Sequence, residues 1–337
     1  MDFRGANKTD SMQPPDFLHK DAETKLCEHF VAAGALCSLS TNSEPILDAA
    51  RSTFQAVDSE WGPVNFRLRL WVDHEDRSRP PWPKPYVRGR DYLVFAGFDE
   101  CSSVVAELRS HRVIGRFSAG MAADLAHWQA VIFPMLLTIV SASVGIAELH
   151  CACVAKNGRG VLLAGPSGAG KSSLAFALSQ QGFGFLSDDR TFYSIENGDP
   201  RVWGLPTPLK LRPGAIQWFE DLRKERLTDT RSGGSAFWLE PERLAGVERV
   251  RQCRPTALIF LERRDTPEFR LTSLSSSDAR DRLSRELMAE SPEADEKRSE
   301  TIEKIADLPC WLLHYGGPPR LIAQQIAEHI ERHLADV

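Results

Sequence analysis

The sequence predicts an α/β fold over residues 148–337, in which a mixed sheet is flanked by helices, and an α+β domain over residues 45–147. Two observations carry this prediction. Strand and helix patterns alternate through the second half, which is typical of a helix-covered sheet, whereas the first half groups several strand patterns before one long apolar helix. With 337 residues, 42% of them hydrophobic, the chain is long enough for two separate cores.

The elements of the first half follow from changes in hydrophobic period. Residues 1–44 are expected to form a weakly ordered tail with one short helix over Ala22–Leu36. A helix is expected over Ser43–Ser59, and the alternation of Asn65–Val72 predicts a half-buried strand. The proline-rich segment Arg79–Pro85 cannot pair inside a sheet and is expected to be a connector. Three further strands are expected at Tyr92–Phe98, Val104–Leu108 and Arg112–Phe117.

A long apolar helix is expected over Ala122–Ser143. The run Gln129–Ala147 holds no charged residue and approaches the length of a membrane span. Pro134 and Gly145 interrupt it, however, and no basic cluster flanks either end. We therefore expect a core helix of a soluble protein rather than a membrane segment.

The apolar strand Val161–Ala164 leads into a glycine-rich turn that has the pattern G-x-x-x-x-G-K-[ST]. Gly165, Gly170, Lys171 and Ser172 satisfy the fixed positions, and a helical segment follows. The strand before the turn and the helix after it are the context that a phosphate-binding loop requires; the alternative is a turn that binds nothing. The expected nucleotide-binding residues are Gly165, Pro166, Ser167, Gly168, Ala169, Gly170, Lys171, Ser172 and Ser173.

Each residue type in this loop has a physical reason. Glycines allow the backbone to point successive N–H groups at an anion, and the start of the helix adds its positive end. Lys171 would contact the β- and γ-phosphates of ATP, and the hydroxyl of Ser172 would be a ligand of Mg²⁺.

An acidic pair, Asp188 and Asp189, follows the next expected strand, Phe183–Ser187. Ligands of such sheets collect at the carboxyl ends of the strands, so this pair is expected beside the loop. One carboxylate of the pair can hold Mg²⁺ through water, while its neighbour accepts a proton from a hydroxyl. The alternative is an acidic pair that caps a turn.

The stretch from His150 through Gly165–Ser172 to Gly182–Arg190 resembles the C-terminal domain of HPr kinase/phosphorylase and the wider HPr-kinase-like group. The resemblance is specific over residues 148–192, loose over 200–335 and absent before 148. It implies a P-loop (Walker A) kinase domain over 148–337 with an HPr kinase/PEP carboxykinase-like fold. It also implies that His150 lies beside the phosphate site, that Asp189 activates a serine hydroxyl and that Asp188 is its companion on the Mg²⁺ side. Without the resemblance, a core histidine would be the simpler interpretation of His150.

Three departures from the family pattern limit what the resemblance implies. Where the family has an acidic residue that helps to hold Mg²⁺, the segment Leu209–Pro213 carries Lys210, and a cation there favours phosphate over metal binding. No match is found to the late segment associated with the reverse, phosphorolysis reaction. The first half also differs from that of the bacterial regulator, which makes HPr itself an unexpected substrate. HPr-kinase-like proteins of peptide natural-product pathways offer a second analogy.

The hypothesis from the sequence is an ATP- and Mg²⁺-dependent phosphotransferase, catalysed by Asp189, His150 and Lys171, that phosphorylates a hydroxyl of a protein or peptide serine. Charge on the transferred group would be offset by phosphate or substrate contacts from Arg190, Lys210 or Arg212. Two alternatives stay open. One is a small-molecule kinase with a compact pocket under a mobile loop over residues 220–235. The other is a catalytically weak, nucleotide-gated binding protein.

Bulk properties set the remaining expectations. The formal net charge of -5 argues against nucleic acid as a partner, and the polar opening segment Met1–Pro15 has no secretory pattern. Seven cysteines without metal-ligand spacing fit a reduced, cytoplasmic protein. Cys151 and Cys153 are expected to be small buried residues, with a redox or metal pair as the alternative. No membrane partner is expected, and the sequence leaves a homo-oligomer open.

Overall fold

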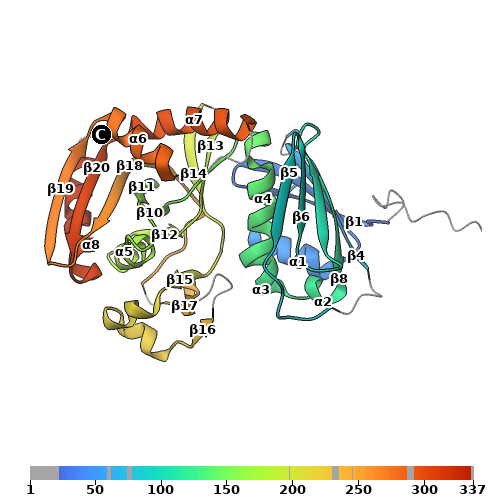
Figure 1. The fold of residues 1–337 in the computed structure, drawn as a ribbon, viewed down its shortest axis with the longest axis horizontal. Helices are drawn as coiled ribbons and strands as arrows, with labels where there is room; N and C mark the ends of the chain where they lie inside the picture. The colour runs from blue at the N-terminus through green and yellow to red at the C-terminus, as the bar shows by residue number, and fades with distance from the viewer. Residues whose placement is uncertain are drawn as a thin grey trace, which may run out of the picture.

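The chain has a mixed α/β fold with two large mixed sheets, one in each half (Figure 1). The computed structural model describes residues 23–58, 62–73, 78–196, 198–229, 235–244, 246–286 and 292–334. The long connected helix that ends near Val144 lies between the two sheets.

The first sheet has eight strands in the order β3-β1-β2-β4-β8-β7-β6-β5. The pairs β2–β4 and β4–β8 are parallel, and the remaining pairs are antiparallel. The strands are β1 (Leu26–Ala32), β2 (Ala35–Thr41), β3 (Gln55–Val57), β4 (Phe66–Asp73), β5 (Tyr86–Arg90), β6 (Leu93–Gly97), β7 (Ser103–Glu107) and β8 (Arg112–Ser118).

The expectation of a weakly ordered tail through residue 44, with a helix over Ala22–Leu36, is wrong for residues 26–41. These residues form the hairpin β1–β2, whose turn places Ala33 and Gly34 at φ 50° and 88°. Phe30 and Leu39 are fully buried, so burial against the sheet overrides the helix preference of the local alanines. Residues 1–22 lie outside the described part of the chain.

Helices cover one face of this sheet. After α1 (Glu44–Thr53) and α2 (Ala119–Ala122), the chain forms a continuous run of α3 (Leu125–His127), the π-helical turn η2 (Trp128–Ile132), α4 (Phe133–Ser141) and the 3₁₀ turn η3 (Ala142–Val144). The expected single helix over Ala122–Ser143 is thus divided. We call the run from Leu125 to Val144 the central helix.

The central helix is, within the described residues, the one helix long and apolar enough to cross a membrane by length and composition. Half of its apolar window is buried inside the protein. Trp128, Phe133 and Leu137 pack into the first core with the sheet, and that core also takes in Phe192 and Trp203 from the second half. Its apolar character therefore has a structural use in joining the two halves.

The second sheet follows the order β12-β10-β11-β18-β14-β13-β9, and β20 pairs with β18 and β19. β11, β18 and β20 are mutually parallel. The expected hairpin between the first strands is confirmed: β10 and β11 are antiparallel, and Asn157 and Gly158 have φ of 53° and 75°. The strands are β9 (Ala147–Leu149), β10 (Ala152–Lys156), β11 (Arg159–Ala164), β12 (Gly184–Ser187), β13 (Thr191–Glu196), β14 (Asp199–Trp203), β18 (Gln252–Arg263), β19 (Glu268–Leu274) and β20 (Cys310–Gly316).

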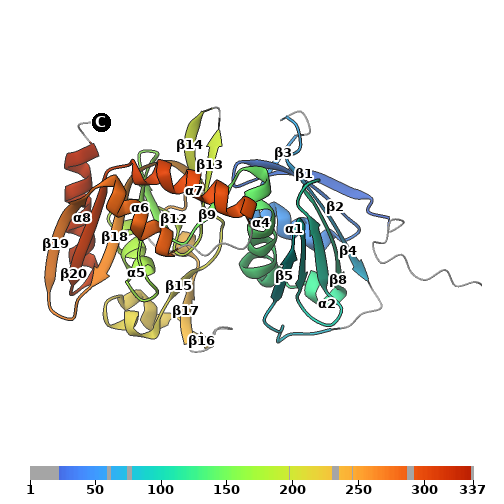
Figure 2. The ribbon, with the colours of Figure 1, turned by 45° about the horizontal axis from the view of Figure 1, so that its top comes forward.

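Helices cover both faces of this sheet, as the alternating pattern predicts. One face packs against α5 (Lys171–Ser179) and α8 (Pro319–Leu334), and the other against α6 (Ser276–Glu286) and α7 (Pro292–Ala306). Figure 2 shows α7 extending from the second half toward the central helix, and it contacts η3. Cys153, in β10, and Cys151, just before that strand, are both buried.

A small third sheet lies beside the second one, in the order β15-β17-β16. Its strands are β15 (Leu209–Leu211), β16 (Leu227–Asp229) and β17 (Ser235–Leu239), and the short 3₁₀ helices η4 (Pro213–Gln217), η5 (Glu220–Lys224) and η6 (Pro241–Arg243) accompany them. Part of the segment 220–235, expected as one mobile loop, is therefore regular structure; residues 230–234 lie outside the described residues.

Candidate active site

The loop between β11 and α5 has the backbone that the glycine pattern predicts. Gly165, Gly168 and Gly170 have φ of 144°, 91° and 95°, a region that side chains disfavour. A Cβ on Gly165 would lie 2.9 Å from the carbonyl oxygen of Leu261, and one on Gly170 would lie 2.0 Å from the hydroxyl of Tyr315. Both glycines are therefore required by conformation and by space.

Lys171 opens α5 and lies in the wall of the loop. Its side chain is buried, and Nζ donates to the carbonyl oxygen of Gly165 at 2.5 Å. Tyr315, from the end of β20, donates its hydroxyl hydrogen bond to the carbonyl oxygen of Ala169. These bonds fix both ends of the loop, so the N-terminus of α5 faces an open space that suits phosphate oxygens.

Asp188 lies at the carboxyl end of β12, on the same edge of the sheet as the loop. Its carboxylate is buried, accepts a hydrogen bond from the backbone N–H of Lys210 at 3.0 Å, and is hydrogen bonded to the side chain of Ser172. Burial raises the pKa of Asp188 to about 6, while these hydrogen bonds act in the opposite direction. The two residues expected to hold Mg²⁺ are thus in contact.

Asp189, the next residue, points away from Asp188 and is solvent-exposed. Its Oδ1 lies 2.9 Å from Nε2 of His150, and this hydrogen bond is the main reason that the pKa of Asp189 is lowered. The turn that carries the pair is fixed by Thr191, whose Oγ1 lies 2.6 Å from Oγ of Ser187 and donates to the carbonyl oxygen of Cys151. One turn therefore presents a buried and an exposed carboxylate.

The three cations predicted to contact phosphate or substrate lie around the glycine loop and the acidic pair, and each has a different partner. Arg212 donates from Nη2 to Oγ of Ser167 at 2.9 Å, on the tip of the loop. Arg190 forms an ion pair with Glu148 at 3.4 Å and lies 3.4 Å from Oγ1 of Thr138. Nζ of Lys210 lies 5.5 Å from the ring centroid of Trp238.

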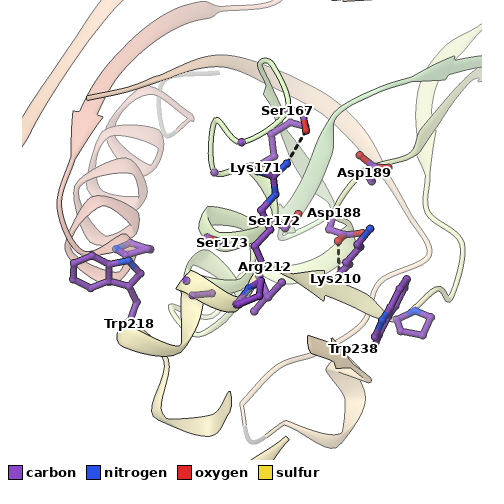
Figure 3. Close-up of a pocket in the computed structure, with 18 of the residues that line it drawn as sticks. Ser167, Lys171, Ser172, Ser173, Asp188, Asp189, Lys210, Arg212, Trp218 and Trp238 are labelled. Carbon is purple, nitrogen blue, oxygen red and sulfur yellow. Dashed lines mark hydrogen bonds between the residues drawn. The ribbon is translucent and has the colours of Figure 1, made fainter. Parts of the chain in front are cut away.

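These residues surround one pocket of about 850 Å³ (Figure 3). Most predicted site residues line it, whereas Gly165, Pro166 and Ala169 are not among its lining residues. The predicted residues that line the pocket are His150, Ser167, Gly168, Gly170, Lys171, Ser172, Ser173, Asp188, Asp189, Arg190, Lys210 and Arg212.

The sequence did not identify several residues that line the same pocket. Trp218 and Trp238 lie on opposite sides of Lys171 in Figure 3, and Trp238 is on the side of Asp189 and Lys210. Ala130 and Pro134, from the central helix, also line it. A half-exposed tryptophan carries no sequence signal of its own, and contacts between distant segments have none, so these residues could be found only from the structure.

The donor set fits a nucleotide with Mg²⁺. Mg²⁺ binds through one or two protein oxygens plus phosphate and water, and Ser172 and Asp188 provide two adjacent oxygens beside the phosphate loop. In the described residues no group of three or more His, Cys, Asp or Glu forms a metal site made of protein alone. Five cations and two aspartates line the pocket, which suits a polyphosphate: Lys171, Arg190, Lys210, Arg212 and Arg263 against Asp188 and Asp189.

No model of a known protein family matches the chain, and no curated protein matches it. Among solved structures it is similar to the Hpr(Ser) kinase/phosphatase from Coxiella burnetii, with 15% sequence identity and a TM-score of 0.29. That match covers 56% of this chain and 93% of the other chain.

Asp188→Asn is expected to stabilise the nucleotide-free protein at pH 8. The pKa of Asp188 in the folded state is above its ordinary value, so the folded protein binds this proton more tightly than the unfolded chain, and the stability that this group contributes is lost as pH rises through about 6. An uncharged amide avoids that loss and keeps an acceptor for the N–H of Lys210. We expect a gain of about 1–3 kcal/mol in the free energy of unfolding at pH 8, shrinking toward pH 4.

Urea unfolding from pH 4 to pH 8 measures this difference. Asp189→Asn is the matched control, because the exposed Asp189 has a lowered pKa and its neutralisation removes a favourable contact with His150. A stability difference for Asp188→Asn that does not change with pH would contradict the explanation.

Proposed function

We propose that the protein is an ATP- and Mg²⁺-dependent phosphotransferase that moves the γ-phosphoryl group of ATP to a hydroxyl, that of a serine in a protein or peptide. The observation that carries the proposal is the arrangement at one sheet edge: a buried carboxylate bonded to Ser172, and an exposed carboxylate bonded to His150 on the next residue. The resemblance of residues 148–192 to HPr-kinase-like proteins points to the same chemistry.

In this proposal the loop binds the phosphates of ATP. Backbone N–H groups at the start of α5 and Nζ of Lys171 contact the β- and γ-phosphate oxygens, and Arg212 lies at the loop tip where it can add a further contact. Ser172 and Asp188 would hold Mg²⁺, which neutralises charge on the phosphates when bound. Binding of the metal requires the ionised carboxylate, and its positive charge would offset the desolvation of Asp188.

Asp189 accepts the proton of the attacking hydroxyl in this mechanism. The hydroxyl oxygen forms a bond to the γ-phosphorus while the bond from that phosphorus to the bridging oxygen of ADP breaks, and the proton passes to Asp189. Phosphoryl transfer has a loose transition state in most analyses, so a carboxylate with a low pKa can still orient the hydroxyl and take its proton late. His150 fixes the orientation of this carboxylate through the 2.9 Å contact.

The base of ATP would lie at the Trp218 end of the pocket. The attacking and leaving oxygens lie on opposite sides of the transferred phosphorus, so the nucleotide must extend away from Asp189. Trp218 is partly buried and lies across the loop from Asp189 in Figure 3. Its exposed ring surface suits stacking with a base, which every nucleobase can do.

One observation favours a second candidate, a nucleotide-gated binding protein. Lys210 occupies the position where the family has an acidic residue, and its backbone N–H is bonded to Asp188. A cation beside the metal position weakens Mg²⁺ binding, which would allow ATP to bind without turnover. A small-molecule kinase was expected to have a compact pocket under residues 220–235. No described residue of that segment lines the pocket.

Asp189→Asn tests the phosphotransferase directly. The amide cannot accept the hydroxyl proton, so phosphate transfer should fall about 100-fold or more, while ATP affinity stays within a few-fold. Transfer of label from [γ-³²P]ATP to serine, in a peptide pool with Mg²⁺, gives the rate, and calorimetry gives the affinity.

Lys171→Met is the companion variant, because it should lose ATP binding itself. A wild-type rate for Asp189→Asn would exclude Asp189 as the proton acceptor. A wild-type protein that binds ATP but transfers no phosphate to any pool would favour the nucleotide-gated binding protein.

Trp218→Ala tests the orientation of the nucleotide. Loss of stacking should weaken Mg²⁺-ATP binding about 10-fold, while binding of Mg²⁺-tripolyphosphate, which has no base, should not change. Calorimetry with the two ligands measures the difference. An equal loss for both ligands, or no loss for ATP, would place the base elsewhere.

A further inference from the structure

The end of the pocket beside Asp189 is built from both halves of the protein. Ala130 and Pro134 line the pocket from the central helix, which reaches Arg190, the neighbour of Asp189, through Thr138 at 3.4 Å. Leu205, Pro208 and Trp238 line the pocket from the second half, and Trp238 lies on the side of Asp189 in Figure 3. Ala130 is exposed and 38% of Trp238 is exposed, so apolar surface on both walls faces the opening. We call this region the Trp238 end.

The Trp238 end also includes Lys210, whose side chain carries a positive charge. Nζ of Lys210 lies over the ring of Trp238, and no carboxylate among the described residues forms an ion pair with it. Arg190, by contrast, is engaged by Glu148. A ligand that fits this end therefore has an apolar group for the two walls and a negative charge for Lys210.

The geometry of transfer makes this end the acceptor side. If the nucleotide extends toward Trp218, the attacking hydroxyl must approach the γ-phosphorus from the opposite side, where Asp189 and Trp238 lie in Figure 3. The volume of about 850 Å³ is near the upper part of the range of about 300–1,000 Å³ for ligand pockets, which leaves room beyond a nucleotide.

We propose that the Trp238 end binds the acceptor as an extended peptide segment, with an apolar side chain close to the serine and an acidic residue within reach of Lys210. The central helix completes this site, so the first half of the protein takes part in choosing the substrate. This inference rests on the phosphotransferase proposed above.

The test uses a degenerate peptide library with a fixed central serine, [γ-³²P]ATP and the full-length protein. The wild type should select apolar residues near the serine and acidic residues at one or more flanking positions. Trp238→Ala should raise KM for the best peptide about 10-fold while KM for ATP stays unchanged. Trp218→Ala is the matched variant at the other tryptophan. It should raise KM for ATP and leave KM for the peptide unchanged.

Two further substitutions test each wall separately. Lys210→Glu should replace the preference for acidic flanking residues with a preference for basic ones. The ratio of basic to acidic residues selected from the library measures this change and does not depend on the overall rate of phosphorylation. Ala130→Arg should raise KM for the peptide, because it fills the opening from an exposed position on the central helix. Ala123→Arg makes the same change at an exposed alanine that does not line the pocket, and should have no effect.

The outcomes separate this inference from the proposed function. If the wild type phosphorylates peptides but Trp238→Ala and Ala130→Arg leave peptide KM unchanged, or Lys210→Glu leaves the selected charge unchanged, the acceptor does not bind at the Trp238 end and the phosphotransferase stands. If the wild type hydrolyses ATP but labels no peptide, a peptide acceptor is excluded. If it neither binds nor hydrolyses ATP, the proposed function fails and this inference fails with it.

Discussion

The shared direction of β11 and β12 is the constraint on which the candidate site depends. Both strands are antiparallel to β10, which lies between them, so both end at the same edge of the sheet. The glycine loop follows the end of β11, and the acidic turn follows the end of β12. Ser172, at the start of the helix after the loop, is hydrogen bonded to Asp188 of the acidic turn. The hairpin at Asn157 and Gly158 and the antiparallel pairing of β12 with β10 thus together bring the glycine loop and the two carboxylates to one edge.

The two carboxylates differ because of their surroundings. Burial raises the pKa of Asp188, whereas the bond to His150 lowers that of Asp189. Adjacent acids with pKa values shifted in opposite directions are a common sign of separate roles. The buried charge of Asp188 destabilises the folded protein, and a neighbouring cation would offset that cost. The exposed Asp189 stays ionised and accessible. In the proposed arrangement, the raised pKa of Asp188 would link the stability of the chain to the binding of Mg²⁺.

Features that depend on local sequence were predicted well, and features that depend on tertiary contacts were not. The positive φ of Gly165 and Gly170, the hairpin at Asn157 and most strands of the second half follow from patterns within a few residues. The sequence also placed His150 and Asp189 near the loop, and the structure brings them into contact. The hairpin β1–β2 was missed because its alanines and serines favour no strand until Phe30 and Leu39 are buried. The roles of Trp218 and Trp238 depend on which surfaces face each other, which no local pattern contains.

The packing between the halves bears on how the acceptor would be chosen. Phe192 and Trp203, from β13 and β14, belong to the core formed by the first sheet and the central helix. Gly34, in the turn of β1–β2, packs so closely that a Cβ would lie 2.5 Å from Oε1 of Glu196 and 3.0 Å from Nε1 of Trp203. A shared core holds the central helix in a fixed position relative to the acidic turn, because moving it would expose large aromatic side chains to water. In the proposed arrangement the walls of the acceptor site are therefore set before a substrate arrives.

The motifs that indicate phosphate transfer lie in residues 148–192, whereas the surfaces that would select the acceptor come from segments outside them. The sequence therefore indicates the chemistry more clearly than the substrate.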